Sequence, residues 1–310
     1  MTRRLLLAAV ALSGLAGCAV PADTNTAVPA AAGPVSGANL DSAIGDFDRA
    51  LRLDPNSSRA YYGRGMAYYA RRDYDRAIGD LDQAIRLEPG YGASYNGRGL
   101  AYTGKRDYDR AIRDYDAAIA IDRNDAAALS NRGYAYLQKR DPDRAISDID
   151  EAIRLQPTAG RFALRGDVYV SKRAYDQALA DFDQALKLDP NLAAAFNGRG
   201  NILFSKRDYD GAIREYDQAI RVNPNYAVGF SNRGLSYRNK GDNDRVIADF
   251  SQALRLDPRY AQAWYGRGVA YANKRDYDRA IKDYDEAIRL NPNEPSYLTA
   301  RGNALRSRTV

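Results

Sequence analysis

The chain has 310 residues, a formal net charge of +6, no His and a single Cys. Without His these residues have no imidazole base, no Ser-His-Asp triad and few options for zinc, and one Cys excludes an intramolecular disulfide. The 46 basic and 40 acidic residues are well mixed, so the net charge of the chain does not require a nucleic-acid partner, and we expect none.

Residues 1–18 have the pattern of an export signal. Arg3 and Arg4 precede an apolar run that is too short for a permanent transmembrane helix, and small residues follow. The last four residues, Leu-Ala-Gly-Cys, resemble the lipobox of bacterial lipoproteins, whose Cys accepts a diacylglycerol. We therefore predict a lipoprotein signal peptide with lipidation at Cys18. The alternative is an ordinary signal that happens to contain a Cys.

The residue after Cys18 bears on localisation. In enteric bacteria an Asp there retains lipoproteins in the inner membrane, whereas this chain has Ala19. The resemblance therefore implies a lipid anchor in the outer membrane, facing the periplasm. Residues 19–38 are rich in Ala, Pro, Gly, Ser and Thr and carry one charge, Asp23. Such a stretch buries too little apolar surface to order itself, so we expect a flexible tether.

A repeated unit organises the rest of the chain. A Gly recurs at a spacing of 34 residues, with one step of 33, at Gly65, Gly99, Gly133, Gly166, Gly200, Gly234, Gly268 and Gly302. A fixed period of this length indicates stacked supersecondary units rather than one globular core.

The unit is clearest between Ala261 and Pro292. Its recurring residues are Trp264, Gly268, Tyr271, Ala280, Tyr284, Ala287 and Pro292, which we number 4, 8, 11, 20, 24, 27 and 32 within the unit. This pattern resembles the tetratricopeptide repeat. The resemblance implies an all-α fold, a superhelical solenoid of helix-turn-helix repeats with a concave groove, and a function in binding proteins or peptides.

The repeats set the expected boundaries. Residues 39–55 match only the second helix of a unit, seven full repeats follow over 56–292, and residues 293–310 match a single first helix that caps the array. Half-repeats at both ends are typical caps of a solenoid. We expect the small residues at positions 8, 20 and 27 to bring helices close, with aromatic rings filling the core between them.

Two charged positions recur in every copy. Position 7 is Arg and position 23 is acidic, so we predict ion pairs that join each acid to the Arg of the next repeat, which leaves no residue without a partner. The alternative is a solvated stripe of charges. The residues are Asp46, Arg64, Asp80, Arg98, Asp114, Arg132, Asp148, Arg165, Asp181, Arg199, Glu215, Arg233, Asp249, Arg267, Asp283 and Arg301.

Two further charge patterns have simple explanations. Acids at position 25 precede bases at position 29, as in Asp48 and Arg52, so we expect i,i+4 pairs on the helix surface. The loop inside each repeat reads Lys-Arg-Asp-Tyr-Asp or nearly so, and its bases would form a basic ridge. That ridge is either a site for anionic lipid or glycan, or only the complement of two helix dipoles.

The concave face in this family is formed mainly by positions 2, 5, 9, 12 and 13. Here these positions include aromatic, apolar and amide side chains, which suit an extended or helical peptide. The candidate groove residues are Tyr62, Met66, Tyr69, Asn96, Leu100, Tyr134, Leu137, Asn197, Asn201, Phe204 and Tyr265. Position 5 never holds Lys, so the Lys-containing clamp that some family members use for C-terminal carboxylates is absent. The alternatives for these residues are helix packing and self-association.

No catalytic constellation, metal site or cofactor motif appears in the sequence. The carboxylates recur at structural positions, and each recurrent Gly belongs to the repeat pattern. The sequence therefore favours a non-enzymatic adaptor lipoprotein that holds an envelope protein or peptide in its groove, with self-association as a further option. The alternative is an envelope binder of glycan or anionic lipid that uses the basic ridge.

Overall fold

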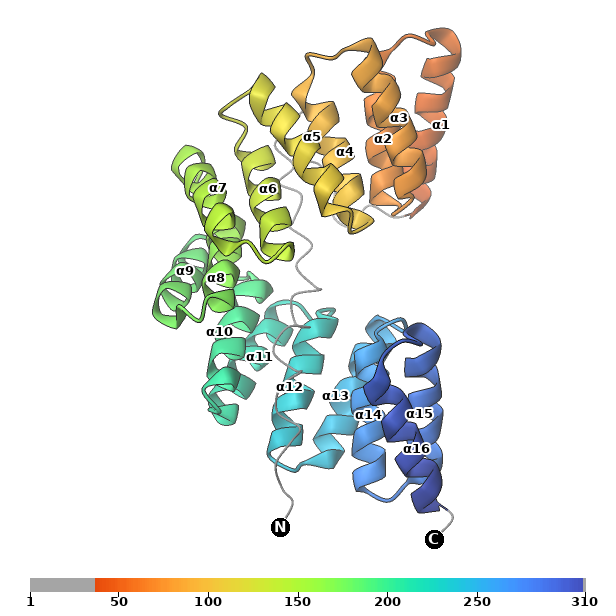
Figure 1. The fold of residues 1–310 in the computed structure, drawn as a ribbon, viewed down its shortest axis with the longest axis vertical. Helices are drawn as coiled ribbons and strands as arrows, with labels where there is room; N and C mark the ends of the chain where they lie inside the picture. Colours follow the sequence, from red (N-terminus) through yellow and green to blue (C-terminus); the bar gives the residue numbers. More distant parts are fainter. Residues whose placement is uncertain (1–36, 309–310) are drawn as a thin grey trace. The chain divides into compact units, whose positions relative to one another are not determined.

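The computed structural model describes residues 37–308, and within that range the chain is all-α and forms no strand (Figure 1). Its helices are α1 (Gly37–Leu53), α2 (Ser58–Ala70), α3 (Tyr74–Leu87), α4 (Gly92–Gly104), α5 (Tyr108–Ile121), α6 (Ala126–Gln138), α7 (Pro142–Leu155), α8 (Ala159–Ser171), α9 (Tyr175–Leu188), α10 (Ala193–Ser205), α11 (Tyr209–Val222), α12 (Ala227–Asn239), α13 (Asn243–Leu256), α14 (Ala261–Asn273), α15 (Tyr277–Leu290) and α16 (Pro295–Arg308). The expected signal peptide, Cys18 and all but two residues of the expected tether lie outside the described residues.

The helices follow the predicted repeats closely. In chain order α1 stands where the half-repeat was expected, α2 to α15 alternate as the first and second helices of the seven expected repeats, and α16 stands where the last first helix was expected. Helix α1 begins at Gly37, two residues before the expected start of the repeat array at Asn39. None of the helices in residues 37–308 is long and apolar enough to cross a membrane.

Aspartates start most of the second helices. The carboxylate of Asp107 accepts a hydrogen bond from the Arg110 N–H at 3.1 Å and so satisfies a backbone donor at the beginning of α5. The Arg110 guanidinium binds the same carboxylate and lies 4.5 Å from the centre of the Tyr102 ring. The same arrangement of cap, Arg and Tyr recurs at Asp73, Asp141, Asp242 and Asp276.

The first helix of each of the seven full repeats ends in a turn with one left-handed residue. At the end of α2 the Arg72 N–H donates to the Tyr69 carbonyl at 2.8 Å and the Asp73 N–H to the Tyr68 carbonyl at 2.9 Å. This closure gives Arg72 a φ of +61°. The equivalent residues with positive φ are Arg106, Arg140, Arg173, Arg207, Gly241 and Arg275.

Small residues let the two helices of a repeat approach closely. A Cβ added to Gly99 of α4 would lie 2.6 Å from the Tyr115 ring of α5, which is itself fully buried. Buried Ala111 and Ala118 flank Tyr115 on the same face of α5. The expected packing of small residues at positions 8, 20 and 27 around an aromatic ring at position 24 is therefore confirmed in this repeat.

The described residues form two compact units, 37–177 and 178–308. Within each unit the second helix of one repeat packs on the first helix of the next. Neighbouring first helices also contact one another, at α2–α4, α4–α6 and α6–α8 and at α10–α12, α12–α14 and α14–α16, whereas no second helices of successive repeats are in comparable contact within either described unit. Each unit therefore curves with its first helices inside.

Candidate functional site

The inner face of each unit is the natural candidate for a binding surface. We call the solvent-facing side of α2, α4, α6 and α8 the N-terminal groove face, and that of α10, α12, α14 and α16 the C-terminal groove face. Positions 5, 9 and 12 lie on one side of a helix because they recur at a helical spacing of three to four residues. The candidate groove residues are therefore considered on these two faces separately.

Three candidate residues come from α2. Tyr62, Met66 and Tyr69 are all half-buried. The Tyr62 ring meets Tyr91 edge-on with centroids 5.4 Å apart, and the Tyr69 ring lies 6.0 Å from that of Tyr74. Burial raises the pKa of the Tyr69 phenol, because the phenolate loses its hydration there. These side chains are held in place by packing and still present part of their surface to solvent.

The neighbouring apolar candidates are less accessible. Leu100 and Tyr134 are half-buried, and Tyr134 packs on a core cluster that contains Tyr136 and Ile149. Leu137 is only 6% exposed and belongs to that same cluster. The expectation that Leu137 offers a groove contact is wrong, because its side chain is used in packing between helices.

The asparagine candidates connect neighbouring repeats. The Asn96 side-chain oxygen accepts a hydrogen bond from Asn131 at 2.9 Å, and the Asn197 oxygen accepts one from Asn232 at 2.8 Å. Asn197 is only 6% exposed, so the prediction that it is a groove contact is wrong. The reason is the direct contact between successive first helices, which places position 5 of one repeat beside position 6 of the next.

The remaining candidates lie on the C-terminal groove face. Asn201 accepts hydrogen bonds from the Tyr216 hydroxyl at 2.8 Å and from Asn232 at 3.2 Å. Phe204 is half-buried and meets Tyr209 edge-on at 5.5 Å. Tyr265 is half-buried, with the Tyr284 ring at 5.9 Å and the Tyr297 ring at 4.9 Å. Phe204 and Tyr265 are thus partly accessible, preorganised rings, whereas Asn201 is committed to bonds within the unit.

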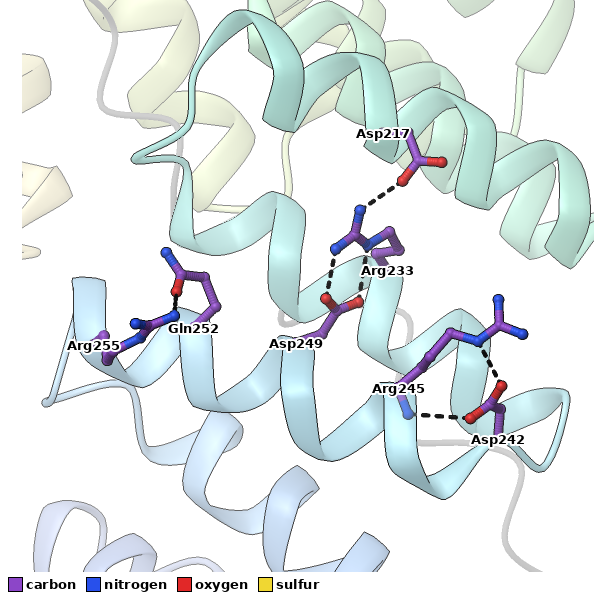
Figure 2. Close-up of polar contacts among 7 residues, drawn as sticks. All are labelled: Asp217, Arg233, Asp242, Arg245, Asp249, Gln252 and Arg255. Atoms are coloured by element: carbon purple, nitrogen blue, oxygen red, sulfur yellow. Dashed lines mark hydrogen bonds and ion pairs between the residues drawn. The ribbon is translucent and has the colours of Figure 1, made fainter.

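The recurring arginines form ion pairs, but with other partners than expected. Arg233 donates from Nε and Nη2 to both oxygens of Asp249 in its own repeat, at 2.9 and 2.6 Å, and from Nη1 to Asp217 of the preceding repeat at 2.6 Å (Figure 2). Arg64, Arg98 and Arg132 bind their acids in the same way. The predicted pairing of each position-23 acid with the next repeat is wrong.

The close contact of the two helices in a repeat explains this difference. A Cβ on Gly65 would lie 3.3 Å from the Cβ of Asp80, so the adjacent Arg64 is already beside the acid of its own repeat. Asp46 belongs to the half-repeat at the N-terminal end of the array and is exposed. Arg301 at the other end instead binds Asp285 at 2.5 Å.

The position-25 acids were also expected to bind elsewhere. Asp48 accepts a hydrogen bond from Arg64 at 2.6 Å, and Asp82 accepts one from Arg98 at 2.6 Å. The expected i,i+4 partners on the same helix are thus replaced by an arginine of the next repeat. Each arginine of this type therefore ties its own second helix to the second helix before it.

Burial affects the charges of these pairs. The hydrogen bonds that Asp114 accepts raise the pKa of Arg98, which opposes the lowering caused by burial. For Asp114 itself, burial raises the pKa, and the bonds from Arg98 offset part of that rise. The pKa values of Asp249 and Asp283 are raised for the same reason. These carboxylates stay ionised chiefly because an arginine is bound to them.

Each loop of the basic ridge carries two successive bases, such as Lys105 and Arg106, and the two have different surroundings. The first base forms an ion pair with the second helix of the preceding repeat, as in Lys105 with Asp75 and Lys172 with Asp143 at 2.5 Å. The second base is the left-handed residue described above and is exposed. This left-handed conformation was not predicted from the sequence. Gly241, which replaces the second base in one repeat, is the signal that could have revealed it.

The comparisons identify the repeats. A family model described as "Tetratricopeptide repeat" matches residues 36–92, 96–160 and 231–295, and one described as "TPR repeat" matches 166–206 and 200–241. The search of curated proteins returned no match. Among solved structures, yeast Tom70 has a TM-score of 0.70 and 20% identity, covering 88% of this chain and 59% of Tom70.

Two other structures show the same fold. A chain of the APC/C hetero-tetramer Cut9–Hcn1 has a TM-score of 0.66 and 19% identity, covering 86% of this chain and 52% of the matched one. A tetratricopeptide repeat protein from Parabacteroides merdae has a TM-score of 0.63 and 20% identity, covering 80% of this chain and 99% of its own. The chain thus spans between half and three fifths of Tom70 and of the Cut9–Hcn1 chain. Because the family models match well over half of its residues, the chain belongs to the tetratricopeptide repeat family.

Proposed function

We propose that this protein is a non-catalytic scaffold of the bacterial cell envelope that holds a partner protein or peptide on a groove face. The observation that carries the proposal is the set of partly exposed, preorganised side chains Tyr62, Met66 and Tyr69 on α2. Rigid aromatic rings lose little conformational entropy on binding and are frequent anchors at interfaces. The Cut9–Hcn1 hetero-tetramer offers a parallel, since a chain of this fold there assembles with another protein.

The proposed location rests on the N-terminal sequence. We infer a lipid anchor on Cys18, with the solenoid facing the periplasm from the outer membrane. Mass spectrometry of the protein from native membranes would then find an acylated N-terminal cysteine. A Cys18→Ser variant would leave the membrane fraction. Cleavage at another residue, or membrane retention of Cys18→Ser, would contradict this anchor.

Affinity capture from cross-linked native membranes tests the partner-binding proposal. The wild type is compared with the triple variant Tyr62→Ala, Met66→Ala and Tyr69→Ala, which removes the anchors from one helix. The matched control is Tyr95→Ala, which removes a half-buried ring at position 4, outside the groove positions. We expect one partner to be captured by wild type and control and lost from the triple variant, while circular dichroism shows all three folded. Equal capture by all three proteins would refute this groove assignment.

The basic ridge is the alternative binding surface, for anionic lipid or glycan. Its exposed left-handed arginines favour it, but its first bases are already paired with carboxylates such as Asp75 and Asp109. Salt distinguishes the two surfaces, because exposed charges are screened within a Debye length of about 8 Å at physiological ionic strength. Binding that is lost at moderate salt and unaffected by the triple variant would favour the ridge.

A further inference from the structure

The α12/α13 repeat places a cation at position 12 of the C-terminal groove face. In the α2/α3 and α10/α11 repeats, positions 12 and 17 hold paired rings, Tyr69 with Tyr74 and Phe204 with Tyr209. The α12/α13 repeat has Arg238 and Asn243 at these positions, and its left-handed loop residue is Gly241. Position 12 is thus a cation in α12, whereas it is an aromatic ring in α10, the first helix of the preceding repeat.

Arg238 is a half-buried cation without an anionic partner. The residue is only partly exposed to solvent, and this burial lowers the pKa of its guanidinium because the charged form loses hydration. No described residue forms an ion pair or a hydrogen bond with this guanidinium. Arg233, less than two turns earlier on α12, instead binds two carboxylates. Because removing a charge from water costs free energy unless a partner compensates, a carboxylate bound to Arg238 would be stabilised there.

The acids of this loop, and the acid that binds its Lys240, already form ion pairs with other bases. Asp242 binds Arg245, Asp244 binds Lys274 and Asp210 binds Lys240. Asn243 accepts a hydrogen bond from Asn273 at 3.1 Å. Positions 2, 5, 9, 12 and 13 of α10, α12, α14 and α16 include no Asp or Glu at all. The C-terminal groove face is therefore positive and lacks an internal anion for Arg238.

We propose that Arg238 anchors a side-chain carboxylate of an acidic peptide bound along the C-terminal groove face. Tyr265 on α14 contributes to the electrostatic environment of Arg238, and Phe204 lies at the same position of the preceding repeat. These two half-exposed rings would contact the apolar parts of the peptide on either side of the anchored carboxylate. This inference rests on the proposed scaffold function and specifies the chemistry of its ligand.

The test is a titration of the whole chain, purified in detergent, with fluorescein-labelled decaglutamate at physiological salt. Arg238→Met keeps the apolar stem and removes the charge, whereas Arg275→Met removes an exposed loop arginine with the same change in net charge. Fluorescence anisotropy should show binding to the wild type that Arg238→Met weakens by about tenfold or more, since a hydrogen bond to a charged group is lost. Arg275→Met should change the affinity less than about twofold, as expected for a screened exposed charge.

Three outcomes would overturn the proposal. They are the absence of decaglutamate binding to the wild type, equal weakening by Arg238→Met and Arg275→Met, and Arg238-dependent binding of phosphatidylglycerol vesicles without binding of the peptide. The test is separate from the capture experiment, because the triple variant on α2 leaves Arg238 intact. Equal capture by the wild type and the triple variant together with Arg238-dependent decaglutamate binding would refute only the groove assignment on α2. Normal partner capture without decaglutamate binding would refute only the proposal for Arg238.

Discussion

Arg64 and Asp80 form a two-pronged ion pair inside a single repeat, with Nε–Oδ2 and Nη2–Oδ1 distances of 2.7 Å each. The third nitrogen of Arg64 binds Asp48 of the preceding repeat at 2.6 Å. One arginine therefore fixes three helices, α1, α2 and α3. The planar guanidinium is suited to this because it donates along several fixed directions, which the ammonium group of Lys cannot reproduce.

The first prediction concerns the loss of such an arginine. Arg98→Met should destabilise the protein by about 3 kcal/mol, because it leaves the buried carboxylate of Asp114 without a cation. Asp82→Asn is the matched control, since it breaks only the more exposed bond of the same arginine and should cost less than about 1 kcal/mol. Urea denaturation at neutral pH measures both. Similar midpoints for the two variants would show that Asp114 does not need Arg98.

The pH dependence of that defect follows from Asp114. Burial raises the pKa of this carboxyl in the folded protein, so its ionisation costs stability as the pH rises through the raised value. Without Arg98 the cost grows. The stability gap between Arg98→Met and the wild type should therefore be largest near pH 7 and shrink towards pH 4. A gap that stays constant over this range would mean that Asp114 is ionised equally easily with and without Arg98.

The cap aspartates predict the opposite trend. The Arg110 backbone N–H and guanidinium lower the pKa of Asp107 below its ordinary value of 3.8. Its contribution to stability is therefore present above the ordinary value and is lost as the pH falls through the lowered one. Asp107→Asn should lower the thermal midpoint at pH 7 and have little effect at pH 2. Equal losses at both pH values would show that the charge of Asp107 contributes nothing.

The period of the sequence was sufficient to predict the fold. The recurrent Gly, Ala and aromatic residues predicted where the helices lie, because the same close contact recurs from repeat to repeat, as between Gly99 and Tyr115 and between Gly268 and Tyr284. Ion-pair partners were beyond this reasoning. Pairs between repeats were predicted because they left neither Asp46 nor Arg301 without a partner. In the structure the close contact of Gly65 with Asp80 places Arg64 beside the acid of its own repeat, and this short distance determines the pairing.

The groove could be predicted only in part for a similar reason. A helical spacing identifies which residues share a face, but it does not give the depth of a side chain between neighbouring helices. Leu137 of α6 and Asn197 of α10 stand at groove positions of their own units and are buried, while Tyr62 and Tyr265 remain partly exposed. Burial at these positions depends on the residue opposite in the next repeat, such as Asn232 for Asn197.

The left-handed loop residues give the next prediction. Arg106 has a φ of +61°, a conformation that costs a residue with a Cβ about 1 kcal/mol relative to Gly. Arg106→Gly should therefore stabilise the protein by about 1 kcal/mol in chemical denaturation. Gly241→Ala, in the equivalent loop, should destabilise it by a similar amount. A loss of stability in Arg106→Gly would show that the arginine side chain contributes more than the strain removes.

The last prediction compares two glycines at position 8. A Cβ on Gly99 would lie 2.6 Å from the Tyr115 ring, whereas a Cβ on Gly302 of α16 would have no described atom within 4 Å. Gly99→Ala should cost about 1–3 kcal/mol, because the ring is fully buried and cannot move away. Gly302→Ala should instead stabilise by about 0.5–1 kcal/mol through the better helix propensity of Ala. Urea midpoints of the two variants measure the difference, and destabilisation by Gly302→Ala would mean that another part of the molecule packs on that face of α16.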